Sequence, residues 1–167
     1  MITLFTELEL KNKVEEISNT IKKNQHHQPP VFICVLNGAF MFFTDLVKHM
    51  DDCYIDFIRA KSYEDQTQGE IQILKSIDID IEGKDVYLVD DIYDSGNTMN
   101  HLVKHLQPKN PKSITPVTLF KKEFSNNKDL IWGFELSKEH WLIGYGLDAA
   151  DGTKRNLPHI LGIQAED

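Results

Sequence analysis

The chain has 167 residues, 41% of them hydrophobic, which suits one domain of ordinary size with a full apolar core. The net charge of −8 argues against nucleic acid as the main partner, because a phosphate backbone needs a basic face, and we interpret the acidity as a source of solubility. No apolar stretch approaches the roughly 20 residues that a membrane span requires, so we expect no membrane partner.

The N-terminal segment lacks the basic and apolar regions of a signal peptide. Cys34 and Cys53 lie in apolar runs and form neither a CxxC pair nor a metal-ligand spacing. Buried, reduced thiols are the better interpretation, and they fit a cytoplasmic protein.

Apolar periodicity predicts the elements in chain order. A capping box at Thr6 and Glu9, followed by apolar residues at helical spacing, predicts an amphipathic helix over residues 7–23. The next elements are a strand at 31–36, apolar throughout and so buried on both faces, and a helix at 39–50. Further strands are expected at 53–58, 71–77, 86–89, 113–120, 130–136 and 141–147, a helix from Ser95 to about Leu106, polar loops at 62–70 and 121–128, and an irregular tail from Asp148.

Strands alternate with helices over the first two thirds of the chain, which indicates parallel βαβ units. We therefore expect one α/β domain over residues 1–167, with a mainly parallel, twisted sheet flanked by helices.

The segment 86–99 is the most informative part of the chain. A short apolar run ends at Asp90 and Asp91, Asp94 follows, and the turn Ser-Gly-Asn-Thr at 95–98 opens a helix. Ligands of an open parallel sheet bind at the carboxyl ends of its strands, and amide groups at a helix N-terminus bind anions. Since acids repel phosphate, this pattern predicts a phosphate on 95–98 and sugar hydroxyls or a hydrated divalent cation on the acids.

Asp94 lies between these two subsites, where it can accept or donate a proton or stabilise positive charge. The alternative is that Asp94 and Ser95 merely cap a helix. Helix capping alone does not explain three carboxylates in five residues directly after a buried strand.

Residues 86–98 resemble the motif of type I phosphoribosyltransferases that binds 5-phosphoribosyl 1-pyrophosphate (PRPP). Other segments resemble hypoxanthine–guanine phosphoribosyltransferases, and the resemblance covers roughly residues 31–162. Residues 35–42 resemble their pyrophosphate loop, 56–63 with Gly69 their mobile catalytic loop, and 141–148 with 155–158 their purine-binding hood.

The resemblance implies a small hood formed by the chain termini and a role for each matched residue. It assigns the general acid/base at ring nitrogen seven of the purine to Asp94 and closure over the reacting centre to Ser62 and Tyr63. The implied contacts to PRPP are Asp90, Asp91, Ser95, Gly96, Asn97, Thr98, Asn37, Gly38 and Arg155; those to the purine are Lys121, Trp141, Leu142 and Asp148; those to magnesium are Asp90, Asp91 and Asp148.

Some of these residues have plainer interpretations. Lys121 could be solvated, Trp141 could be a core residue, and Asp148 could cap the tail, while Arg155 could be a surface charge. Asn37 stands where many members of the family carry lysine, which matters little if the main chain makes the contact.

The implied function is Mg²⁺-dependent transfer of phosphoribosyl from PRPP to hypoxanthine or guanine in purine salvage, by a homodimer or homotetramer. One alternative is a regulatory protein that binds PRPP or nucleotides on the same fold. The other is a phosphoribosyltransferase with another base preference, such as xanthine.

Overall fold

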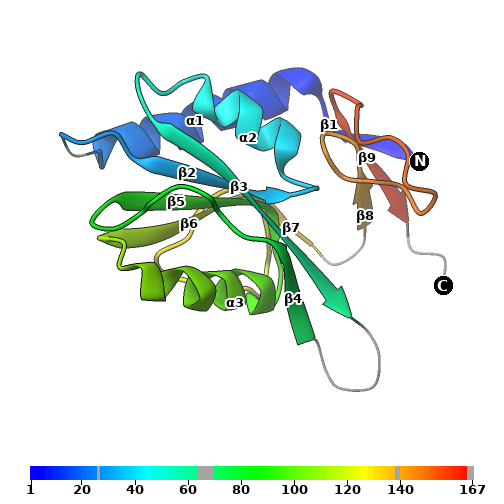
Figure 1. Cartoon of the computed structure of the whole chain (residues 1–167). Coiled ribbons are helices and arrows are strands. Elements are labelled where there is room, and N and C mark those ends of the chain that lie inside the picture. The colour runs from blue at the N-terminus through cyan, green and yellow to red at the C-terminus, as the bar shows by residue number, and fades with distance from the viewer. Residues whose placement is uncertain (26, 64–69, 138–139, 165–167) are drawn as a thin grey trace.

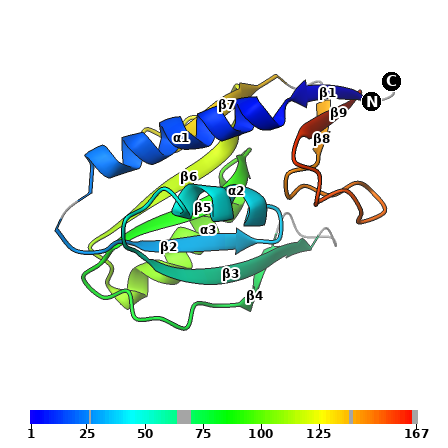
Figure 2. The same ribbon diagram turned by 90° about the horizontal axis from the view of Figure 1, so that it is seen from above.

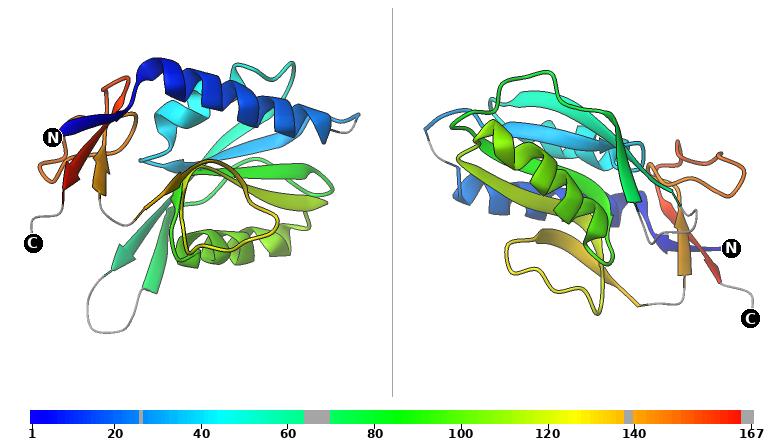
Figure 3. Two further views of the ribbon diagram at one scale, coloured as in Figure 1. Left: turned by 180° about the vertical axis from the view of Figure 1, so that it is seen from behind. Right: turned by 60° about the horizontal axis from the view of Figure 1, so that its bottom comes forward.

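The computed structural model describes residues 1–25, 27–63, 70–137 and 140–164. A main sheet has the strand order β4 (Glu70–Lys75), β3 (Tyr54–Tyr63), β2 (Val31–Leu36), β5 (Asp85–Tyr93), β6 (Ser113–Lys122) and β7 (Ile131–Leu136). A smaller sheet has the order β1 (Ile2–Phe5), β9 (Ile160–Gln164) and β8 (His140–Ile143). We call this small sheet, with the segment 144–159 between β8 and β9, the hood; it lies at one end of the molecule, near both termini (Figure 3).

The helices divide between the two faces of the main sheet. α1 (Glu7–Lys23) and α2 (Phe40–Val47) cover one face, and α3 (Asn97–Leu106) covers the other, followed by the short 3-10 helix η1 (Gln107–Lys109) (Figure 1). None of the described helices is long and apolar enough to cross a membrane. The strands β2, β3, β5, β6 and β7 pair in parallel, and only β4 joins the main sheet antiparallel. This arrangement confirms the predicted α/β class.

Local sequence signals account for the best-predicted elements. The capping box is present, because the Thr6 hydroxyl accepts from the Glu9 amide at 3.3 Å while the Glu9 carboxylate accepts from the Thr6 amide at 2.8 Å. Residues 31–35 of β2 are fully buried, as expected for a strand with an apolar cluster on each face. Both the α1 and the β2 boundaries match the prediction.

Other boundaries correct the prediction. β5 continues past Val89 to Tyr93, and β6 continues past Phe120 to Lys122, because the two strands remain paired there. Ser62 and Tyr63 belong to β3, paired with β4, instead of to a loop; residues 64–69 of that expected loop lie outside the described residues. β8 ends at Ile143.

The tail is not wholly irregular. Ile160–Gln164 forms β9, and Ile2–Phe5 forms β1, which the prediction missed. These strands are defined by pairing with each other, with Ile2 opposite Gly162, and carry little signal of their own.

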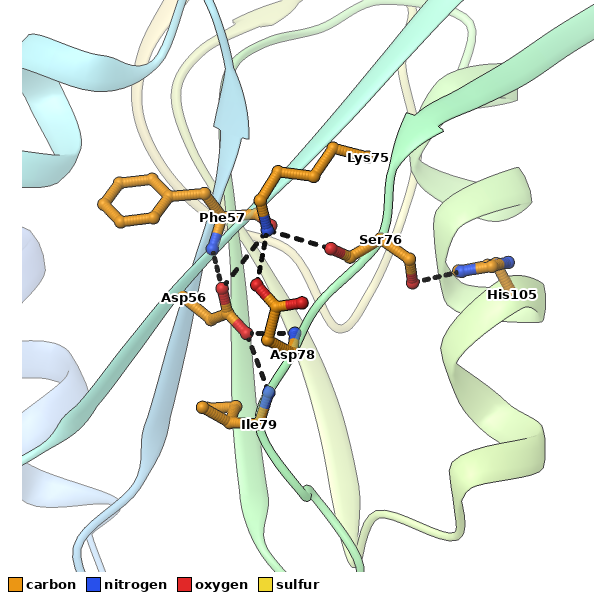
Figure 4. Close-up of polar contacts among 7 residues, drawn as sticks. All are labelled: Asp56, Phe57, Lys75, Ser76, Asp78, Ile79 and His105. Atoms are coloured by element: carbon orange, nitrogen blue, oxygen red, sulfur yellow. Dashed lines mark hydrogen bonds and ion pairs between the residues drawn. The ribbon is translucent and has the colours of Figure 1, made fainter.

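A buried carboxylate fixes the connection between β4 and β5. Asp56 of β3 is 6% exposed, and its carboxylate accepts from the amides of Asp78 (2.7 Å) and Ile79 (3.0 Å) and from its neighbour Phe57 (2.7 Å) (Figure 4). Lys75 lies 3.6 Å away. Burial raises the pKa of Asp56, but the three amides and Lys75 outweigh it, so the pKa is lowered overall.

We expect Asp56→Ala to destabilise the fold by about 1–3 kcal/mol, because three amides lose their buried acceptor. The depressed pKa makes this contribution fully present above the unfolded value near pH ~4 and lost as pH falls below it. Urea unfolding at pH 7 and pH 3 measures both effects. The matched control is Asp78→Ala, which removes an exposed partner of Lys75 and should change little; equal losses in the two variants would contradict the interpretation.

Candidate active site

The carboxyl end of β2 points toward the hood (Figure 2). A cavity of about 270 Å³ lies there, at the carboxyl ends of β2 and β5. It is lined by Val35, Leu36, Gly38, Ala60 and every residue from Asp90 to Met99. The structure therefore brings the predicted acids, the turn 95–98 and Gly38 together around one space. Asn37 is not part of this lining; its carbonyl accepts from the Phe40 amide at 3.3 Å.

The turn before α3 has the geometry of an anion site. Gly96 is the N-cap with φ of 85°, a conformation that glycine adopts at little cost. The Ser95 hydroxyl accepts from the Asn97 amide, the first of the helix, at 3.3 Å, while the N-cap residue Gly96 has no side chain to bind the amides that follow. Of the two residues considered as helix caps, Ser95 binds one amide of the first turn, whereas the N-cap position belongs to Gly96 and not to Asp94. The amides that follow Asn97 in the first turn can bind a ligand.

The carboxylates of Asp90, which is 9% exposed, and of Asp91, which is half-buried, lie next to each other at the cavity. Burial first, and then the neighbouring charge of Asp91, raises the pKa of Asp90 well above its usual range. Burial also raises the pKa of Asp91, although hydrogen bonds and Arg155 oppose the shift. Backbone amides partly compensate, because Asp91 donates to Asp90 at 2.9 Å and Ile92 donates to Asp91 at 2.7 Å. An uncompensated negative charge of this kind favours a bound cation or hydroxyl donors.

Gly38 is confined between this pair and the hood. A Cβ at Gly38 would overlap with the Asp91 carboxylate, and a Cβ at Gly146 of the hood would overlap with the Gly38 carbonyl. Three segments that are distant in sequence therefore meet at Gly38, which lies against the Asp91 side chain and the Gly146 main chain with no room for a side chain at either glycine.

A second cavity, of about 280 Å³, opens beside the first. It is lined by Ile92, Asp94, Lys122, Trp141, Leu142, Leu147 and Asp148. Asp94 and Ile92 line both cavities, so Asp94 stands between the two spaces. Trp141 is 67% exposed, which excludes its interpretation as a core residue.

Lys121 and Arg155, two residues that the sequence predicts to contact substrate, form ion pairs with other side chains of the protein. Lys121 does not line either cavity: its ammonium group lies 2.6 Å from Glu135 and 4.6 Å from the centre of the Trp132 ring. Arg155 donates to the Gly146 carbonyl at 2.7 Å and pairs with Asp148 at 2.8 Å, so it is not a solvated surface charge.

Sequence reasoning missed Lys122, Gly146 and Ser125. The Ser125 hydroxyl donates to the Asp94 carbonyl, across 31 residues, and no local pattern signals that contact. Gly146 had a signal in the Gly-Tyr-Gly triplet at 144–146, which suggests unusual backbone geometry. Ser62 and Tyr63 end β3, and Ser62 is not in the lining of either cavity.

The fold and the site match a known class. The family model described as phosphoribosyl transferase domain matches residues 4–150. The chain belongs to this family of pentosyltransferases.

Within this family, the chain is similar to proteins named hypoxanthine-guanine or hypoxanthine phosphoribosyltransferase. The chain is 37% identical to a hypoxanthine-guanine phosphoribosyltransferase of Bacillus subtilis (94% of this chain, 89% of the relative). It is 38% identical to one from Aquifex aeolicus (96% and 93%). Its structure is similar to a hypoxanthine-guanine phosphoribosyltransferase of Bacillus anthracis, with a TM-score of 0.90, 38% identity and 98% of each chain covered. A Trypanosoma cruzi hypoxanthine phosphoribosyltransferase in complex with the product IMP matches with a TM-score of 0.85 and 29% identity, over 97% of this chain and 93% of that one.

We expect Asp90→Asn to raise the melting temperature of the ligand-free protein at pH 7. Because the folded pKa of Asp90 is raised, the folded state binds more protons than the unfolded state above pH ~4, and stability falls as pH rises through that interval. Thermal unfolding from pH 4 to pH 8 should show that the difference in melting temperature between Asp90→Asn and the wild-type protein grows with pH. The control is Asp85→Asn at the other end of β5, where Lys112 and Ser113 already compensate the carboxylate, and it should show no gain. A stability loss in Asp90→Asn at pH 7 would contradict the electrostatic picture.

Proposed function

We propose that the protein transfers the 5-phosphoribosyl group of PRPP to hypoxanthine, guanine or both, releasing pyrophosphate and forming IMP or GMP in purine salvage. The observation that carries this proposal is Asp94 at the junction of two cavities, one suited to a phosphorylated sugar and one to a flat base. Family membership and relatives named for this reaction support it.

PRPP would occupy the first cavity. The amides and hydroxyls of Ser95, Gly96, Asn97 and Thr98 would hold the 5-phosphate at the positive end of α3. Asp90 and Asp91 would accept from the ribose hydroxyls. Gly38 and Asn37 would contact pyrophosphate through main-chain groups, and Arg155 would reach it on leaving Asp148.

The donor set at Asp90 and Asp91 fits magnesium, which prefers carboxylate oxygens and keeps several waters. Among the described residues, no group of three or more His, Cys, Asp or Glu side chains is arranged to hold a metal ion, so substrate oxygens and water would complete the coordination. When bound, Mg²⁺ would neutralise the leaving pyrophosphate. Asp148 would contribute to a second magnesium only after its ion pair with Arg155 opens.

The chain's own residues would act on the purine. The bond from the anomeric carbon to pyrophosphate breaks as the bond to the purine nitrogen forms, with positive charge developing on the ribose. Asp94 would take the proton from the purine ring nitrogen, and the Ser125 hydroxyl, which binds the Asp94 carbonyl, would fix its main chain. Closure of the segment at Ser62 and Tyr63 would exclude water as a competing nucleophile.

The second cavity would bind the base. Trp141 would stack on the ring, and the Leu142 main chain would contact its edge. The family resemblance gives the contact with the 6-oxo group to Lys121, which would have to leave Glu135. A xanthine preference stays open as an alternative, because the 6-oxo group is common to these bases.

We also infer that residues 1–167 fold as one domain that assembles as a homodimer or homotetramer in the cytoplasm. Hood residues such as Leu142 and Ile160 share an apolar cluster with Leu10 of α1, which supports one folding unit. Ile55 and Phe57 of β3 are 44% and 38% exposed, and such an apolar surface suits a second copy.

The function is tested by incubating the purified protein with Mg²⁺, PRPP and each of hypoxanthine, guanine, xanthine, adenine and uracil. We expect nucleotide from the 6-oxopurines hypoxanthine and guanine. PRPP binding without product from any base would favour the regulatory alternative.

Asp94→Asn keeps the shape of the side chain and removes the base, so we expect kcat to fall by about 10²–10⁴-fold. Asp51→Asn, an exposed acid in the bend between α2 and β3, serves as the control and should keep wild-type kcat. Full activity of Asp94→Asn would contradict the assignment of Asp94 as the base that takes the purine proton.

The two neighbouring lysines can be distinguished directly. If Lys121 makes the 6-oxo contact, Lys121→Ala should raise KM for hypoxanthine by about 10-fold or more, the loss of a charged hydrogen bond, with KM for PRPP little changed. Lys122→Ala is the matched variant, since Lys122 lines the base cavity. A large effect of Lys122→Ala and none of Lys121→Ala would move the role to Lys122.

A further inference from the structure

The turn after β8 has an unusual backbone. Three consecutive residues have positive φ: Gly144 (96°), Tyr145 (48°) and Gly146 (103°). Such a conformation is uncommon for a residue with a bulky side chain and persists only when the surroundings impose it. Tyr145 is 5% exposed, so the contacts of its buried side chain can impose this backbone conformation.

The Tyr145 side chain ties the turn to a helix of the main body. Its hydroxyl donates to Oδ2 of Asp45 in α2 at 2.6 Å, while Lys48 donates to the other carboxylate oxygen at 3.1 Å. Burial and the hydrogen bond to Asp45 raise the pKa of Tyr145, which keeps the phenol a neutral donor.

Apolar packing and the hydrogen bond both hold this junction, since Tyr145 shares a buried cluster with Phe42 and Leu46 of α2. A cavity of about 500 Å³ borders the hydrogen bond and is lined by residues of α1, α2 and the hood, among them Met41, Asp45, Tyr145 and Pro158. Both partners of the Tyr145–Asp45 hydrogen bond line this space, so the bond lies at the border of the packed cluster and is its polar link between the hood and α2.

The turn leads directly to the residues proposed for pyrophosphate. The Gly146 carbonyl accepts from Arg155 at 2.7 Å, and the Gly146 main chain lies against the Gly38 carbonyl with no room for a Cβ. Gly38 in turn lies against Asp91. A shift of the turn would therefore move the Arg155 guanidinium and release the Gly38 main chain together.

We propose that Tyr145 is a positioning residue for the pyrophosphate half of the site, because its hydrogen bond to Asp45 holds the turn 144–146 against the segment leading into α2. The inference rests on the proposed function, since it takes Gly38 and Arg155 as the pyrophosphate contacts. The base half depends less on this bond, because Trp141 and Leu142 are held by the pairing of β8 with β9.

Tyr145→Phe removes only the hydroxyl. We expect KM for PRPP in the forward reaction and for pyrophosphate in the reverse reaction to rise by about 5- to 30-fold. KM for the purine and kcat should change by less than about twofold, a split that a general loss of stability would not produce. Asp45→Ala should reproduce this result. Asp45→Asn keeps an acceptor oxygen and should restore nearly wild-type KM values.

Tyr87→Phe is the matched control, because Tyr87 is a buried tyrosine that lines neither cavity, and it should leave all KM values unchanged. Hydrogen exchange of the amides at 37–40 and 144–147 gives a readout independent of turnover and should accelerate in Tyr145→Phe. If the wild-type protein makes no nucleotide, the proposed function fails. The hydrogen-exchange result alone then decides whether the Tyr145–Asp45 hydrogen bond holds the turn 144–146. Unchanged exchange with unchanged KM for PRPP, or equal rises in both substrate KM values, would overturn the inference.

Discussion

The desolvation of two adjacent carboxylates at the carboxyl end of β5, one buried and one half-buried, is the constraint on which the site depends. Asp90 and Asp91 directly follow the buried segment Val86–Val89 of β5, so their charges are desolvated by the same core that stabilises the sheet. Backbone amides compensate only part of this charge. In the function proposed above, a cation with its substrate would supply the rest, so binding would relieve an electrostatic cost that the ligand-free protein carries.

Glycine contacts connect this charged centre to the hood. Gly38 approaches Asp91 from one side and Gly146 from the other, and neither position has space for a side chain. The hood is thereby brought over the same edge of the sheet, with Trp141 and Asp148 beside Asp94. Both substrates would meet at Asp94 because the fold joins two cavities there.

The features that could be predicted from the sequence are those that depend on residues close together in the chain. The apolar run of β2 and the acids and turn at 86–99 are local patterns, and both take their predicted place. The pairing of β1 with β9 could not be predicted, because it depends on contacts between the two ends of the chain. The sequence also could not show which of Lys121 and Lys122 faces the base cavity. Adjacent residues of a strand point to opposite faces, and the strand was expected to end at Phe120, before both lysines.

The central claim is that the raised pKa values of Asp90 and Asp91 reflect a carboxylate pair prepared for a magnesium–PRPP complex. Isothermal titration of Mg²⁺ and PRPP into the protein at pH 5 to 6, in buffers of different ionisation enthalpy, counts the protons exchanged on binding. Since a bound cation favours ionised carboxylates, binding should release protons from the wild-type protein and fewer from Asp90→Asn. Binding with no proton release, or with equal release from both proteins, would contradict the claim.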